Sequence, residues 1–218
     1  MEDFYVVRGI VLKHAPAGDY DWVVTIFTAD KGKITAFAKG ARKPVSKLAG
    51  SVEPFNFGTF KLFVGRNSYT IIEADIENYF EDFRGDLEGA CYGTFFLEIA
   101  SFYGRENSED KQLLNLLYIS LKALLKKQIP NRLVRCIFEL RTLQIEGEYP
   151  GIPENTPLLD STRYAMDFIT TSPLEKLYSF SLSKEVLDEL DEITEGFRKR
   201  FIDRPLKSLE MLETFEKT

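Results

Sequence analysis

The chain has 218 residues and a formal net charge of −6, with 28 Lys and Arg against 34 Asp and Glu. This length suits one large domain or two small ones, and apolar residues make up 44% of the chain, enough for a buried core. The net charge excludes uniform attraction to a polyanion. No apolar run approaches the roughly 18–20 residues of a membrane span, and the acidic start at Met1–Asp3 is unlike a signal peptide. We therefore expect a cytoplasmic protein.

The first 80 residues predict short β-strands and no long helix. Runs rich in β-branched and aromatic residues are followed by turn signals, and they cover Tyr5–Lys13, Trp22–Thr28, Lys33–Lys39, Phe55–Val64 and Tyr69–Ile76. Five short strands leave exposed edges unless the sheet closes, and a five-stranded OB-fold is a common solution at this size. An SH3-like barrel is the alternative.

After Tyr79 the apolar residues recur at helical spacing. The pattern predicts helices over residues 87–99, 113–125, 133–140 and 186–201, and a short last helix after Pro205. Residues 158–182 have no clear period. We therefore predict an α+β chain, with an N-terminal five-stranded OB-fold β-barrel over residues 1–80 and an all-α helical bundle domain over residues 81–218.

Positive charge is concentrated in residues 31–66, which hold eight Lys and Arg and one acid, Glu53. In the third predicted strand, Phe37 shares a face with Lys33 and Lys39, and Gly40 then leads into a basic loop. Cations beside an aromatic ring are typical of a sequence-tolerant single-strand site. The candidate nucleic-acid contacts are Lys31, Lys33, Phe37, Lys39, Arg42, Lys43, Lys47 and Arg66. The alternative is a lysine-rich strand edge that prevents aggregation, and Trp22 is interpreted as core.

A second basic feature lies in the third predicted helix. Arg132, Arg135 and Arg141 punctuate its apolar face, and Lys126 and Lys127 precede it. A groove rimmed by these cations would accept an acidic peptide with a hydrophobic end. The alternative, which we favour from the residues alone, is surface pairing at helical spacing, such as Arg135 with Glu139.

Catalytic patterns are missing from the sequence. It has no Gly-rich phosphate loop before a helix, no Gly-x-Ser-x-Gly elbow and no Cys/His cluster at metal-ligand spacing. His14 is the sole histidine, and Cys91 and Cys136 are interpreted as reduced, buried thiols. We therefore expect no enzyme, metal, cofactor or small-molecule substrate.

Several segments together resemble the bacterial RecO family of recombination mediators. They are Val7–Leu12 (VRGIVL), Gly18–Asp21 (GDYD), Lys31–Lys33 (KGK), Ala38–Lys43 (AKGARK) and Arg135–Arg141 (RCIFELR) with Gly147–Pro150 (GEYP). The likeness runs over about residues 4–150, and the order and spacing of the motifs make it more specific than any one of them.

The resemblance implies an N-terminal OB-fold, a helical C-terminal domain and no catalysed reaction. It implies binding of single- and double-stranded DNA, annealing of complementary strands, and cooperation with RecR and with the acidic tail of single-stranded-DNA-binding protein (SSB) in loading RecA. It points to Lys39, Arg42 and Lys43 as DNA contacts, to Arg132 and Arg135 near the site for the SSB tail, and to a cytoplasmic, nucleoid-associated location.

The chain departs from many family members at one place. They carry a four-cysteine zinc module after this point, whereas Gly151–Pro157 contains no cysteine. Structural zinc is therefore predicted absent, and the module near residues 150–182 is expected to be degenerate or missing.

Two other functions remain open from the residues: a protein–protein adaptor whose lysines confer solubility, and an RNA-binding barrel protein.

Overall fold

The computed structural model describes residues 4–66, 68–152 and 157–216. The chain divides into two compact units: Met1–Gly85 with Leu97–Tyr118, and Asp86–Phe96 with Ile119–Thr218. The boundary between the units therefore passes through helices α1 (Leu87–Tyr103) and α2 (Lys111–Leu124). The division predicted between residues 80 and 81 stays a prediction.

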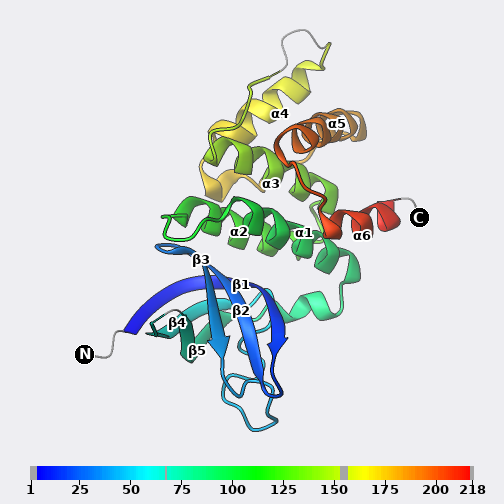
Figure 1. Cartoon of the computed structure of the whole chain (residues 1–218). Helices are drawn as coiled ribbons and strands as arrows, with labels where there is room; N and C mark the ends of the chain where they lie inside the picture. Colours follow the sequence, from blue (N-terminus) through cyan, green and yellow to red (C-terminus); the bar gives the residue numbers. More distant parts are fainter. Residues whose placement is uncertain (1–3, 67, 153–156, 217–218) are drawn as a thin grey trace. The chain divides into compact units, whose positions relative to one another are not determined.

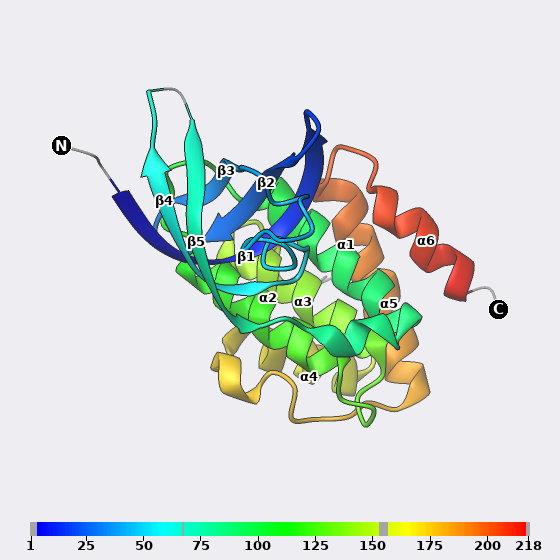
Figure 2. The same ribbon diagram turned by 90° about the horizontal axis from the view of Figure 1, so that it is seen from below.

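Five strands of the first unit form a closed barrel (Figures 1 and 2). They are β1 (Phe4–Ala17), β2 (Asp21–Thr28), β3 (Gly32–Ala38), β4 (Phe57–Val64) and β5 (Tyr69–Asn78). The strand order is β1-β2-β3-β5-β4, in which β3 and β5 are parallel and the other pairs are antiparallel. This Greek-key order confirms the predicted OB-fold.

The first strand is long enough to pair with two neighbours. Its first half pairs with β4 and its second half with β2, and the register shifts between Val11 and Lys13 at a bulge. Gly9 and Gly58 are paired across β1 and β4. A Cβ on Gly9 would lie 2.3 Å from the carbonyl oxygen of Phe27, so this close approach of strands requires glycine.

Alternation along β3 separates the core from the outer surface. Ile34, Ala36 and Ala38 are buried in the barrel core, while Thr35 and Phe37 face outward. This is the two-residue period that the sequence predicts for the strand. The basic and aromatic side chains are therefore presented together on the outside of the barrel.

The barrel unit also includes the connection between α1 and α2. The Lys33 amide donates to the Arg105 carbonyl at 2.9 Å, and the Asn107 amide donates to the Lys31 carbonyl at 3.0 Å. Nearby, the fully buried Phe27 ring packs so closely that a Cβ on Gly104 would lie 2.8 Å from it. Residues 104–107 thus complete the outer surface of β2 and β3.

The second unit is helical and contains α3 (Asn131–Ile145), α4 (Asp160–Thr171), α5 (Lys184–Phe201) and α6 (Lys207–Glu216). Helix α3 contacts both α4 and α5. The segment without a clear period, 158–182, contains α4 and a 3-10 turn at Leu174–Lys176. Part of the zinc-module position, residues 153–156, lies outside the described residues.

Both cysteines are unpaired and buried, which confirms their interpretation as buried thiols. Burial raises the pKa of the Cys136 thiol far above its ordinary value. In the described ranges, no helix is both long and apolar enough to cross a bilayer.

Candidate nucleic-acid interface

A groove of about 500 Å³ opens on the outer surface of the barrel unit. Four of the predicted contacts line it: Lys31, Lys33, Phe37 and Arg66. The remaining lining residues come from β3, from the β4–β5 turn and from the loop after α1, and they include Tyr69, Glu106 and Asn107. The structure therefore brings together cations and an aromatic ring that lie up to 35 residues apart in the sequence.

The groove follows from the way β3 and β5 meet. These strands pair at Ala36 with Tyr69 and at Phe37 with Thr70, close to the end of β3. The β4–β5 hairpin extends away from the rest of the barrel (Figure 2), and its turn is closed by a 2.9 Å bond from the Gly65 amide to the Ser68 carbonyl. In OB-folds, the β2–β3 face and the loops β1–β2 and β4–β5 are the usual surfaces for oligonucleotides.

The three cations of the groove have different surroundings. The Lys31 ammonium lies 5.0 Å from the ring centroid of Tyr5. The Lys33 ammonium donates a 2.7 Å hydrogen bond to the Ser101 carbonyl in the last turn of α1. Arg66 is exposed at the hairpin turn. A phosphate in the groove would meet one exposed cation, Arg66, and two cations that contact neighbouring residues.

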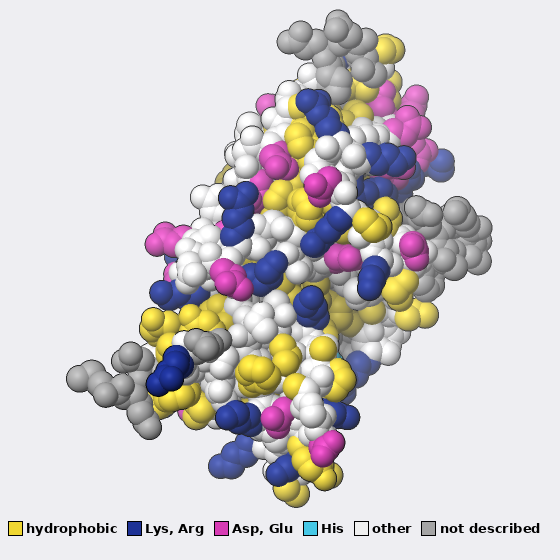
Figure 3. Space-filling view, viewed as in Figure 1, with side chains coloured by type: hydrophobic (Ala, Val, Ile, Leu, Met, Phe, Trp, Pro, Cys, Tyr) yellow, Lys and Arg dark blue, Asp and Glu magenta, His cyan; other side chains and the backbone are white. Residues whose placement is uncertain are grey.

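The other four predicted cations lie on the β3–β4 loop and do not line the groove. Lys39, Arg42, Lys43 and Lys47 are all exposed. In the space-filling view, Lys and Arg are interspersed with hydrophobic side chains over the barrel strands (Figure 3). The sequence therefore predicts these residues as one site, whereas the structure divides them between a groove and a loop.

The β3–β4 loop is held against the β1–β2 loop by its own cations. The Arg42 guanidinium donates to the Gly18 carbonyl at 3.1 Å and lies over the Trp22 ring. The Lys43 ammonium lies 5.2 Å from the ring centroid of Tyr20, which is 55% exposed. Tyr20 was not among the predicted contacts, although it belongs to the GDYD segment singled out in the sequence.

Trp22 packs against the barrel core, as its interpretation from the sequence expects. Its ring is also stacked on His14, with centroids 4.0 Å apart and planes 3° from parallel. Because His14 and Arg42 contact this ring, the Trp22 indole supports the loop cations rather than offering a bare platform for a base.

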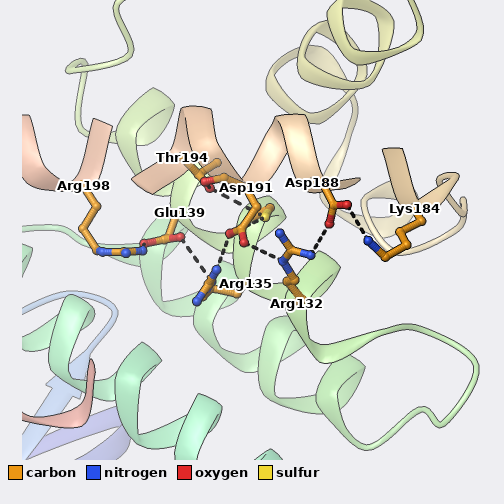
Figure 4. Close-up of polar contacts among 9 residues, drawn as sticks. Arg132, Arg135, Glu139, Lys184, Asp188, Asp191, Thr194 and Arg198 are labelled. Atoms are coloured by element: carbon orange, nitrogen blue, oxygen red, sulfur yellow. Dashed lines mark hydrogen bonds and ion pairs between the residues drawn. The ribbon is translucent and has the colours of Figure 1, made fainter. Parts of the chain in front are cut away.

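The second predicted site, on α3, is occupied by ion pairs with α5 (Figure 4). Arg132 donates to Asp191 and to Asp188, each at 2.5 Å. Arg135 also donates to Asp191, and its side chain is 4% exposed. Carboxylates of α5 therefore pair with both arginines, and their assignment to a peptide groove stays a prediction.

The interhelical network continues along α3. Glu139 accepts a 2.7 Å hydrogen bond from Arg198, and its other oxygen lies 3.8 Å from the Arg135 Nε atom. The pairing of Arg135 with Glu139 at helical spacing is therefore present, but it is buried and not on the surface. Arg141 instead donates to the carbonyls of Ile169 and Thr170 at the end of α4.

The network controls the ionisation of Asp191. Burial removes water from its carboxylate and opposes the charged form, but the charges and hydrogen bonds of Arg135 and Arg132 outweigh this cost. The pKa of Asp191 is consequently below its ordinary value.

Of the four cations predicted for the peptide site, Lys126 and Lys127 are exposed, in the loop between α2 and α3.

Across the part of the chain that the structure describes, no cluster of three or more His, Cys, Asp or Glu side chains is arranged to hold a metal ion. Among the described residues of the barrel unit, cations and aromatic rings line one groove.

Comparisons with known proteins identify the family to which the chain is similar. The family model described as "Recombination protein O N terminal" matches residues 1–80, and "Recombination protein O C terminal" matches residues 84–152 and 151–210. Three relatives are each named "DNA repair protein RecO". The name refers to DNA repair and to no catalysed reaction, in agreement with the predicted non-enzymatic function.

The relative from Acetivibrio thermocellus is 30% identical, over 99% of this chain and 98% of its own length. The relative from Clostridium perfringens strain 13 is 28% identical over 94% and 96%. The relative from Alkaliphilus metalliredigens is 34% identical over 66% of this chain and 59% of its own length. By its match to both family models and to these relatives, the chain belongs to the RecO family of DNA repair proteins.

Proposed function

We propose that this chain is a non-enzymatic recombination mediator that binds single- and double-stranded DNA through the outer surface of its barrel. It anneals complementary strands and, together with RecR, helps RecA load on DNA coated with SSB. This activity places it in the cytoplasm, associated with the nucleoid. The observation that carries the proposal is the groove in which Lys31, Lys33 and Arg66 surround the exposed ring of Phe37.

The mechanism is electrostatic and non-covalent. Two single strands repel each other through their phosphates, and cations that neutralise phosphates reduce this repulsion. The groove offers a stacking surface for bases, while the β3–β4 loop offers Lys39, Arg42, Lys43 and Lys47 to a backbone of variable shape. A strand held by its backbone keeps most bases available for pairing with a second strand.

The acidic SSB tail is proposed to bind near the loop between α2 and α3. Lys126 and Lys127 are exposed there, in contrast to the paired Arg132 and Arg135. An acidic peptide that needed the two arginines would have to displace Asp188 and Asp191. We therefore assign the peptide's carboxylates to the two lysines.

The DNA assignment is tested with the full chain and a fluorescent single-stranded oligonucleotide. Replacement of Lys31 and Arg66 by alanine is expected to weaken binding by about ten-fold or more. Each phosphate contact that is lost reduces the number of counterions released on binding, and this release favours the complex. The control is Lys126→Ala with Lys127→Ala, which makes the same change in charge outside the groove. Equal affinity of the folded groove variant and the wild type would contradict the proposal.

The same assay separates the two other functions. An RNA-binding protein would favour the RNA oligonucleotide over DNA of the same sequence, because the 2′-hydroxyl is a contact that DNA lacks. An adaptor would bind neither oligonucleotide, or bind without dependence on salt. The proposed function requires DNA binding at least as tight as RNA binding.

A further inference from the structure

One wall of the groove carries a negative charge that a simple phosphate-binding surface would not need. Glu106 lines the groove together with Lys31, Lys33 and Phe37. A carboxylate at this position repels phosphates, and it reduces the attraction provided by the neighbouring cations. What a carboxylate attracts in a nucleic acid is an amino group on the edge of a base.

The position of Glu106 is fixed by the backbone on both sides. The Lys33 amide donates to the carbonyl of Arg105, and the Asn107 amide donates to the carbonyl of Lys31, so Glu106 lies between two hydrogen bonds to β3 and its preceding turn. Glu106 itself forms an isolated bridge with Gly32. Backbone hydrogen bonds therefore attach this wall to β3 and to the turn before it.

Gly32 shows how closely the two segments approach. A Cβ at this residue would lie 1.9 Å from the Arg105 carbonyl oxygen, and its φ of +59° is in the left-handed region that favours glycine. The turn before β3 can therefore approach residues 105–107 this closely only because residue 32 is a glycine and has no Cβ. The contact places Glu106 in the lining of the same groove as the exposed ring of Phe37.

A ring and a carboxylate in one groove match two parts of a nucleobase. The face of an unstacked base can lie on an aromatic side chain, and its Watson–Crick edge is then available for hydrogen bonds. Cytosine, adenine and guanine carry an exocyclic amino group on that edge, whereas thymine and uracil carry a single N3–H donor between two carbonyls. A carboxylate accepts a hydrogen bond from the amino group, whereas the two carbonyl oxygens that flank N3–H of thymine or uracil repel it.

We infer that Glu106 makes the groove select bases that carry an amino group over thymine and uracil. This inference rests on the proposed function, since it assumes that a DNA strand enters the groove. The cations then set the strength of binding, and Glu106 sets which base is held on Phe37. The annealing surface is consequently sequence-tolerant along the backbone but has a preference at one base.

The test compares oligonucleotides of twenty deoxycytidines and twenty deoxyuridines, which differ at the Watson–Crick edge alone. By fluorescence anisotropy with the full chain, deoxycytidine is expected to bind at least about five-fold more tightly, the lower end of what a good base contact supplies. Glu106→Gln is expected to bring this ratio close to one, because the amide can donate to uracil as well as accept from cytosine.

Glu109→Gln is the matched control, because Glu109 is exposed on the same connection but does not line the groove. It removes the same charge and is expected to keep the five-fold ratio. A wild-type ratio near one would overturn the inference, as would a Glu106→Gln variant that binds both oligonucleotides more tightly by the same factor. Binding of neither oligonucleotide by the wild type would instead refute the proposed function.

Discussion

The guanidinium carbon of Arg42 lies 5.2 Å from the ring centroid of Trp22, and the two residues belong to loop and strand segments that meet at one end of β2 and β3. A cation in this position stabilises its own loop and still exposes charge to solvent. The backbone supports the same contact, since the Arg42 amide donates to the Tyr20 carbonyl at 2.9 Å. These contacts of Arg42 with Trp22 and Tyr20 therefore fix the position of the basic loop on the barrel.

Reversal of charge on this loop is the first prediction. Replacement of Lys39, Arg42 and Lys43 together by glutamate is expected to weaken single-strand binding by more than about ten-fold, because phosphates then meet three negative charges in place of three positive ones. Binding is measured by anisotropy, and circular dichroism checks the fold. Unchanged affinity of a folded triple variant would exclude the loop from the site.

The second prediction concerns the buried ion pairs between α3 and α5. Asp191→Asn leaves Arg132 and Arg135 without their shared charge, and loss of one partner of a buried pair costs about 3 kcal/mol. The free energy of unfolding, from urea denaturation at pH 7, is expected to fall by that amount. A variant as stable as the wild type would show that the network contributes no net stability.

The same pair predicts a dependence on pH. The pKa of Asp191 is lowered in the folded state, so its contribution is present above the ordinary aspartate pKa and is lost as the pH falls through the lower, folded value. The difference in stability between the wild type and Asp191→Asn is therefore expected to shrink on acidification below about pH 4. Urea titrations from pH 7 down to pH 3 measure it. A difference that stays constant over this range would contradict the assignment.

Replacement of two glycines by alanine is expected to change the stability of the protein in opposite directions. A Cβ on Gly104 would lie 2.8 Å from the Phe27 ring and 2.9 Å from the Ala100 carbonyl oxygen, so Gly104→Ala is expected to destabilise the protein by about 1–3 kcal/mol. A Cβ on Gly196, inside α5, meets nothing within 4 Å, and Gly196→Ala is expected to stabilise by roughly 0.5–1 kcal/mol. Thermal unfolding of both variants checks the signs. A stabilised Gly104→Ala variant would show that residues 104–107 do not pack tightly on β2.

Truncation tests the composition of the barrel unit. A fragment of residues 1–80 lacks Gly104 and the partners of Lys31 and Lys33, and it exposes Phe27, which is fully buried in the whole chain. We expect this fragment to be less stable than one ending after residue 118, as judged by its melting temperature. Equal stability of the two fragments would support the boundary predicted near residue 80.

Short-range patterns predict the elements of this fold well. The alternation of Ile34, Ala36 and Ala38 with Phe37 and Thr35 identifies β3 and its outer face. The position of Pro130 locates the start of α3, and Gly104 the end of α1. These features depend on side-chain periodicity and on backbone preferences of single residues, which the sequence displays directly.

Features that depend on distant contacts are not predictable in this way. The second wall of the groove comes from Glu106 and Asn107, about seventy residues beyond Lys33, and no local pattern links them. Arg135 has a partner 56 residues away, on α5, so its amphipathic position alone is compatible with either a peptide site or a buried pair. The packing of the chain decides between the two.

Salt dependence of single-strand binding tests the central claim, that the barrel holds DNA through phosphate neutralisation in the groove. For the wild type, with about three phosphate contacts, one for each cation of the groove, affinity is expected to fall roughly twenty-fold between 50 and 200 mM salt. The slope of log affinity against log salt is expected to become shallower by about 0.7 for each contact removed in Lys31→Ala with Arg66→Ala. A shallow slope for the wild type, or the same slope for the variant, would contradict the account.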